Sequence, residues 1–177
     1  MIKEWIDTYH PANKDEALQA LREIMQEIAL AGLERSGFFE KAAFYGGTAL
    51  RIFYGLNRYS EDLDFSLLKA DEDFALERHL NSIQTEFESA GMRVTVKKKE
   101  KTLRNNIDSA FLKTDTVWRE LILENIIPQN GLDQNPNIKI KLEIETLSIF
   151  LIKSSINSSL LIVLFFQSPL STALFKK

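Results

Sequence analysis

The chain has 177 residues, of which 45% are hydrophobic and 27% charged, and this composition is typical of a folded globular protein rather than a disordered one. The length suits one domain with its own core, or one domain with a small appendage. A formal net charge of -3 argues against a protein that coats nucleic acid over its whole surface, and the absence of cysteine excludes disulfides and thiolate metal sites. The polar start, MIKEWIDTYHPANKDEA, does not resemble a signal peptide, so we expect a cytoplasmic protein with no membrane partner.

Hydrophobic spacing predicts an alternation of helices and strands. Apolar residues recur every three to four positions up to Leu33, which indicates a long helix that ends before Gly37. In chain order we expect a helix from Asn13 or Lys14, a strand over Ala42–Tyr45, a helix over Thr48–Tyr54, a strand over Asp62–Leu68, a helix over Asp71–Ala90, paired strands over Met92–Lys99 and Ile107–Leu112, a helix over Thr116–Asn125 with Trp118, Leu121 and Ile122 inward, and a strand over Ile138–Thr146.

The last stretch of the sequence differs in composition from the rest. From Leu147 onward it contains no Asp or Glu and is rich in Ser, Leu, Ile and Phe. Its most apolar run, Leu160–Phe166, is too short to cross a bilayer. Two interpretations stay open: a buried strand or helix, or a shift of the reading frame near Thr146. We therefore expect a core domain over residues 1–146 and a divergent apolar tail over 147–177.

The glycine pair Gly46-Gly47 lies between a predicted strand and a predicted helix. Glycines let the backbone approach a bulky anion closely, and N–H groups at a helix N-terminus favour phosphate. Thr48 follows and would either cap the helix or offer its hydroxyl to the phosphate. The alternative is that both glycines serve only a tight turn.

Asp62 and Asp64 are separated by one residue on a predicted strand. Positions i and i+2 share a face, so both carboxylates would project to one side while Leu63 and Phe65 face the other. Two neighbouring carboxylates repel each other, and a divalent cation such as Mg²⁺ removes that penalty. The alternative is a pair of solvated charges at a strand end.

The alternating strand IKIKLEIET supplies a third carboxylate for a two-metal arrangement. On its polar face Glu143 is the first candidate and Glu145 the second. Lys139 and Lys141 share that face and would balance the charge of a triphosphate. An ordinary amphipathic strand with a charged outer face would give the same pattern.

The stretch GGTALRIFYGLNRYSEDLDF resembles the signature of the AbiEii/AbiGii-type nucleotidyltransferase toxins, within the DNA polymerase β-like nucleotidyltransferase superfamily. The resemblance implies an α/β (α+β) fold, in which a mixed sheet is flanked by helices. It places Mg²⁺ or Mn²⁺ at Asp62 and Asp64 and a nucleoside triphosphate at Gly46 and Gly47. Ser60 falls where the family has a serine near the nucleotide.

The resemblance also implies an activity, in which a nucleotide is transferred from the triphosphate to a hydroxyl of RNA, such as tRNA, or of protein. Arg58 or Lys141 would offset phosphate charge, and Glu143 would assist on the attacking side. Such toxins have a cognate antitoxin. The family continues into a helical half with a lysine helix and an Arg-Asp…Asp segment, which this sequence lacks after Thr146. We therefore expect a truncated or frameshifted member, either a weakened enzyme or a nucleotide-binding remnant.

Two other enzyme classes use an Asp-x-Asp motif. Phosphatases of the haloacid dehalogenase kind place the first aspartate after a very apolar strand, whereas Asp62 follows the polar residues NRYSE. Glycosyltransferases with this motif need a much longer chain. Both classes fit the sequence less well than a nucleotidyltransferase.

Overall fold

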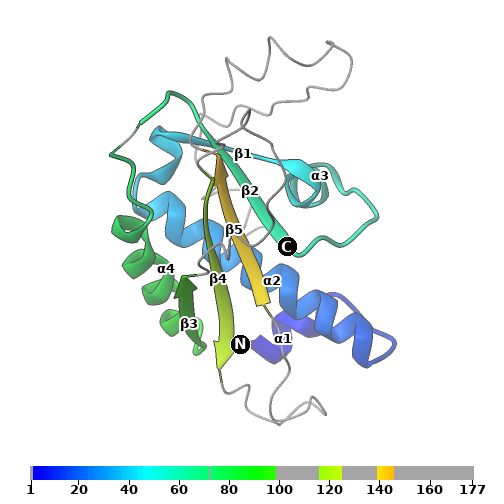
Figure 1. Ribbon diagram of the computed structural model, residues 1–177. Coiled ribbons are helices and arrows are strands. Elements are labelled where there is room, and N and C mark those ends of the chain that lie inside the picture. The colour runs from blue at the N-terminus through cyan, green and yellow to red at the C-terminus, as the bar shows by residue number, and fades with distance from the viewer. Residues whose placement is uncertain (1, 72, 99–115, 125–138, 146–177) are drawn as a thin grey trace, which may run out of the picture.

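The computed structural model describes residues 2–71, 73–98, 116–124 and 139–145. Within these ranges, five strands form one mixed sheet in the order β1-β2-β5-β4-β3, and helices α2 and α4 cover one of its faces (Figure 1). The elements are α1 (Ile2–Asp7), α2 (Lys14–Arg35), the 3-10 turn η1 (Phe38–Glu40), β1 (Ala42–Tyr45), α3 (Gly46–Tyr54), β2 (Asp62–Leu67), α4 (Glu77–Ser89), β3 (Arg93–Lys98), β4 (Thr116–Glu124) and β5 (Lys139–Glu145).

Helix α2 begins at Lys14, where its sequence predicts, and hydrogen bonds run in both directions across its start. The side chain of Asn13 accepts a hydrogen bond from the N–H of Glu16, and the Glu16 carboxylate accepts one from the N–H of Ala12 at 2.7 Å. The Asn13 contact satisfies a first-turn N–H that has no partner within the helix, and the Glu16 contact fixes the chain just before the N-cap. The apolar stripe of α2 then packs into the core, so the predicted long helix is confirmed.

Strands β2 and β5 lie side by side in parallel at the centre of the sheet, with β1 antiparallel to β2. Alternate residues of both strands are buried on the face that α2 covers: Leu63, Phe65, Leu67, Ile140, Leu142 and Ile144. The predicted strands over Ala42–Tyr45, Asp62–Leu68 and Ile138–Thr146 are confirmed over these described positions. Their polar residues face the opposite side of the sheet.

The helix predicted over Thr116–Asn125 is wrong, because the segment is strand β4, paired with both β3 and β5. A short apolar run fits either period, and the spacing of Trp118, Leu121 and Ile122 matched a helix. The segment is a strand because its backbone N–H and C=O groups pair with those of β3 on one side and β5 on the other. Residues of the TVWRELIL type also favour strands intrinsically, since β-branched and aromatic side chains fit a pleated surface.

The helix predicted over Asp71–Ala90 begins only at Glu77. Residues before it form turns, in which the Asp71 carbonyl accepts from the N–H of Phe74 and the Asp71 carboxylate from the N–H of Asp73. Short acidic side chains bond to nearby backbone in this way in preference to a helix. Helix α1 was not predicted.

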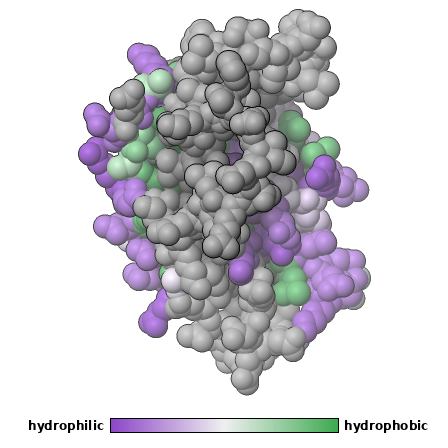
Figure 2. Space-filling model, in the orientation of Figure 1, coloured by the Kyte–Doolittle hydropathy of each residue, from purple (hydrophilic) through white to green (hydrophobic). Residues whose placement is uncertain are grey.

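Two predictions lie outside the described residues, namely the strand over Ile107–Leu112 and the tail over 147–177. Among the described residues, no helix is both long enough and apolar enough to span a bilayer. The described surface is predominantly hydrophilic in the view of Figure 2, with hydrophobic residues in small areas.

Gly32 allows α2 and α4 to pack closely. A Cβ built there would lie 2.5 Å from the Ile83 Cα and 2.8 Å from its backbone nitrogen. Because these are backbone atoms within a helix, a side chain at this position forces the two helices apart.

We predict that Gly32→Ala lowers the free energy of unfolding by about 1–3 kcal/mol, the cost of overpacking, although alanine favours a helix by about 1 kcal/mol. Denaturant unfolding measures the change. Ala31→Ser, at the neighbouring half-buried position, is the control and should cost no more than about 0.5 kcal/mol. A stabilised Gly32→Ala protein would contradict this account of the helix contact.

Candidate functional site

The glycine corner contacts the acidic strand directly. β1 ends at Tyr45, whose register partner on β2 is Asp64, and α3 begins at Gly46 with a φ of +82°. A Cβ on Gly46 would lie 2.5 Å from the Asp64 carboxylate oxygen Oδ2, and one on Gly47 would lie 3.8 Å from the Ser60 hydroxyl. Gly46 is therefore required both by its backbone conformation and by the closeness of the carboxylate.

Thr48 links the corner to the acids by a route that the sequence did not indicate. Its side chain is buried, and its hydroxyl donates a short hydrogen bond of 2.5 Å to the main-chain carbonyl of Asp62. Tyr45, and not Thr48, is the N-cap of α3. Because a hydroxyl has one proton to donate, this geometry supports a structural role for Thr48 more than a contact with phosphate.

Asp62 and Asp64 are half-buried and share one face of β2, as predicted, opposite the face that α2 covers. The intervening Leu63, like Phe65, is completely buried on the other face. The parallel register places Asp62 beside Lys141 and Asp64 beside Glu143. Four charged residues from two neighbouring strands therefore gather on one face, next to the glycine corner.

Lys141 is the positive charge of this group. Its ammonium forms an ion pair with the Glu143 carboxylate. The hydrogen bond to Glu143, and the charges of Glu143, Asp62 and Asp64, raise the pKa of Lys141 above its ordinary value, although partial burial opposes the shift. The lysine thus offsets the repulsion among three carboxylates.

Asp62 and Asp64 are the candidate ligands for a divalent cation at this site. The aspartate pair offers hard oxygen ligands on one face, which suits Mg²⁺ with water and phosphate in its remaining positions. In the part of the chain that the structure describes, no three acidic or histidine side chains converge on a point where they could hold a metal. The pair fits a cation bound by two carboxylates, whereas Glu143 is engaged by Lys141. Glu143 as a ligand, and Glu145 beside Ser66 in the register, stay predictions.

The residues predicted near the nucleotide from the loop before β2 lie in different environments. Arg58 is exposed, and Ser60 is half-buried with its hydroxyl near Gly47. The carbonyl of Ser60 accepts a hydrogen bond from the side chain of Gln26 at 2.8 Å.

Sequence reasoning missed three residues that hold this loop, Glu23 and Gln26 on α2 and Arg51 on α3. A usable signal was present, because Glu23 and Gln26 are polar residues that flank the apolar pair Ile24 and Met25 on a helix facing the core.

Comparison with known proteins agrees with this arrangement. Residues 28–156 match the family described as nucleotidyl transferase AbiEii toxin, type IV TA system. Among solved structures, the fold is similar to that of MenT4, nucleotidyltransferase toxin Rv2826c from Mycobacterium tuberculosis H37Rv, with a TM-score of 0.54 and 17% sequence identity. That likeness covers 84% of this chain and 44% of the MenT4 chain, so this chain spans less than half of the length of that toxin. No curated protein sequence matches the present chain.

The mixed sheet with its flanking helices is thus the fold of a nucleotidyltransferase-type toxin domain. The family match extends over most of the chain and includes both the glycine corner and the acidic strand. The protein belongs to the AbiEii family.

We predict that Gly46→Ala weakens nucleotide binding about tenfold or more, because its Cβ displaces the Asp64 carboxylate; tenfold corresponds to about 1.4 kcal/mol. Titration calorimetry with an NTP and Mg²⁺ measures the affinity. Gly91→Ala is the matched control, since Gly91 has a φ of +74° with no atom within 4 Å of its built Cβ. Both variants should lose about 1–2 kcal/mol of stability through strained backbone. Equal nucleotide affinity in both would contradict the role of Gly46.

Proposed function

We propose that this protein is a metal-dependent nucleotidyltransferase, the toxin of a type IV toxin–antitoxin pair, that transfers a nucleoside monophosphate from an NTP to a hydroxyl of RNA, such as tRNA, or of protein. The observation that carries the proposal is the juxtaposition of Gly46 with Asp64. A backbone bend that favours phosphate lies directly against a pair of carboxylates that favours a cation. Few sites other than one for a metal–triphosphate complex require both.

Each residue of the site has a role in this reaction. Asp62 and Asp64 would hold a divalent cation, which supplies charge neutralisation at the phosphates and activation of the attacking hydroxyl. The first turn of α3, at Gly46 and Gly47, would receive the β- and γ-phosphates at its N–H groups. Lys141 lies on the same face and would offset triphosphate charge.

The chemical step is an in-line displacement. The acceptor oxygen forms a bond to the α-phosphorus, the bond to the bridging oxygen of pyrophosphate breaks, and the acceptor proton passes to a base. Glu143, whose register partner on β2 is Asp64, would take part on the attacking side. Arg58, exposed on the loop before β2, and Ser60, beside Gly47, would contact the nucleotide. Catalysis of this type rests mainly on positioning and charge stabilisation.

Incubation of the full 177-residue chain with labelled NTPs, Mg²⁺ and bulk tRNA or protein tests the proposal. We expect label transfer that falls by about 100-fold or more in Asp62→Asn and Asp64→Asn, the scale on which loss of one charge-stabilising group acts. Asp73→Asn, an exposed aspartate in the turn before α4, is the control and should keep full activity.

The other outcomes are equally informative. Nucleotide binding that depends on Asp62 but gives no transfer to any acceptor would assign the chain as a nucleotide-binding protein without transferase activity. If the chain neither binds nucleotide nor transfers label, the proposal is overturned.

A further inference from the structure

The loop over residues 55–61, which joins α3 to β2, is held from beneath by helix α2. It carries Arg58 and Ser60 and ends at the first acid of β2. Backbone bonds hold its two ends, from the N–H groups of Gly55 and Leu56 to the last turn of α3 and from the Lys141 N–H to the Glu61 carbonyl at 3.4 Å. The residues between these ends are held in addition by side chains that reach them from other elements.

Gln26 makes the most deeply buried of these contacts. Its side chain is 2% exposed, and its Nε2 donates to the Ser60 carbonyl at 2.8 Å across 34 residues of sequence. A buried amide on a core helix costs free energy unless it is hydrogen-bonded, and here its bond goes to the loop. The residue that accepts it is the one whose hydroxyl lies next to Gly47.

A second anchor is the ion pair between Glu23 and Arg51, whose side chains are 5% and 15% exposed. The Arg51 guanidinium lies 3.5 Å from the centre of the Tyr59 ring and donates from Nη1 to the Leu56 carbonyl at 3.1 Å. One planar group thereby contacts both the start of the loop, at Leu56, and its middle, at Tyr59, which a lysine ammonium could not do.

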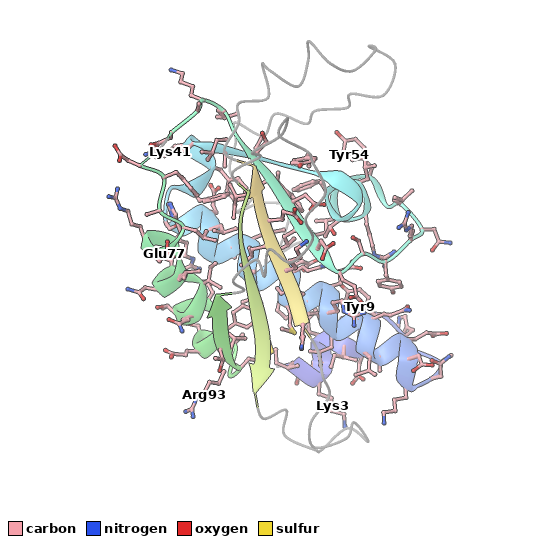
Figure 3. The ribbon with its side chains drawn as sticks, in the orientation of Figure 1. Lys3, Tyr9, Lys41, Tyr54, Glu77 and Arg93 are labelled. Carbon is pink, nitrogen blue, oxygen red and sulfur yellow. The ribbon has the colours of Figure 1, made fainter. Side chains whose placement is uncertain are left out.

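Tyr9 contacts the oxygen of the Glu23 carboxylate that Arg51 does not. Its hydroxyl donates to Glu23 at 3.3 Å, and Figure 3 shows it beside α2. Burial, followed by the charges of Glu27 and Glu23, raises the pKa of Tyr9 far above its ordinary value, so the phenol stays a donor. A further ion pair, Arg22 with Glu61 at 3.3 Å, is largely exposed on its acidic side and adds little.

The free energy needed to bury these polar and charged groups suggests that they do more than stabilise the core. Buried ion pairs and amides are often replaceable by apolar residues of similar volume with no loss of stability. Their neighbours Ile24 and Met25 already pack fully into the core. What Glu23 and Gln26 add, and apolar residues would not, is a fixed loop.

We propose that Gln26 and the Glu23–Arg51 pair are positioning residues, which hold the 55–61 loop so that Ser60 and Arg58 meet the nucleotide at the Gly46-Gly47 corner. The expected effect on nucleotide binding rests on the proposed function, whereas the contact between these residues and the loop does not. The acids stand on β2, which is fixed separately by Leu63 and Phe65 in the core. Loosening the loop therefore affects nucleotide binding more than the chemical step.

Hydrogen exchange tests the loop contact without reference to activity. In Gln26→Met, of similar volume, the hydrogen-bonded loop amides of Leu56 and Arg58 should exchange about tenfold faster, as expected when a bond of about 1.4 kcal/mol is lost, while those of α4 are unchanged. Gln84→Met on α4 is the control and should leave the loop unaffected. Unchanged exchange at Leu56 and Arg58 would overturn the inference, whatever the protein does with nucleotides.

The functional consequence has its own measurement. We expect Gln26→Met to raise the Kd for NTP with Mg²⁺, and the KM in transfer, about tenfold while kcat changes less than twofold. A fall in kcat with unchanged KM would overturn the positioning role. Absence of nucleotide binding by the wild-type chain would count against the proposed function alone, because the exchange result stands without it.

A double variant covers the case in which one substitution prevents folding. Arg51→Met alone leaves the buried Glu23 charge unpaired, so it is combined with Glu23→Leu. The double variant should stay folded and expose the loop to faster exchange, whereas Arg51→Lys should give an intermediate effect because it keeps the charge but loses the planar contacts. A double variant with a loop as protected as the wild type would contradict the proposal.

Discussion

The alternation of strand β2 is the constraint on which the site depends. Leu63, Phe65 and Leu67 have no exposed surface, and their burial fixes which face of the strand points outward. Because side chains alternate with a period of two, Asp62 and Asp64 must then share the outer face. A slip of one residue would bury both carboxylates in the aromatic core and expose Phe65, so packing on one face fixes the charges on the other.

Charge on that outer face is balanced within the sheet. Glu143 and Lys141 alternate with buried Leu142 and Ile144 on β5, so the same period that exposes the acids of β2 brings a cation beside them. Lys141 lies beside Asp62 in the register while its ammonium pairs with Glu143. In the proposed function, a cation bound by the aspartates would repel the Lys141 ammonium and favour its contact with phosphate. The Lys141–Glu143 pair is only partly buried, so solvent weakens it.

The sequence predicted the parts of this arrangement that local rules determine. The start of α2 near Lys14, the end of α3 at Tyr54 and the alternation of β2 and β5 are all set by neighbouring residues, and each was placed within one or two positions. Strand β4 was missed because its identity depends on two partners distant in sequence. The ion pair of Lys141 with Glu143 and the bond from Thr48 to Asp62 were missed for the same reason: spacing shows which residues share a face, but not which atoms meet.

Helix α2 belongs both to the core and to the candidate site. The family match begins at residue 28, whereas Glu23 and Gln26 precede it. A fragment that began at the matched boundary would keep the glycine corner and the acids, yet it would remove the partner of Arg51 and the donor to Ser60. The residues that match the family include the glycine corner and the acids, while the preceding turn of α2 supplies the donor and the ion-pair partner that hold the loop. In the proposed function, a triphosphate would need its contacts placed to within a fraction of an ångström, so the functional site would extend further toward the N-terminus than the family match.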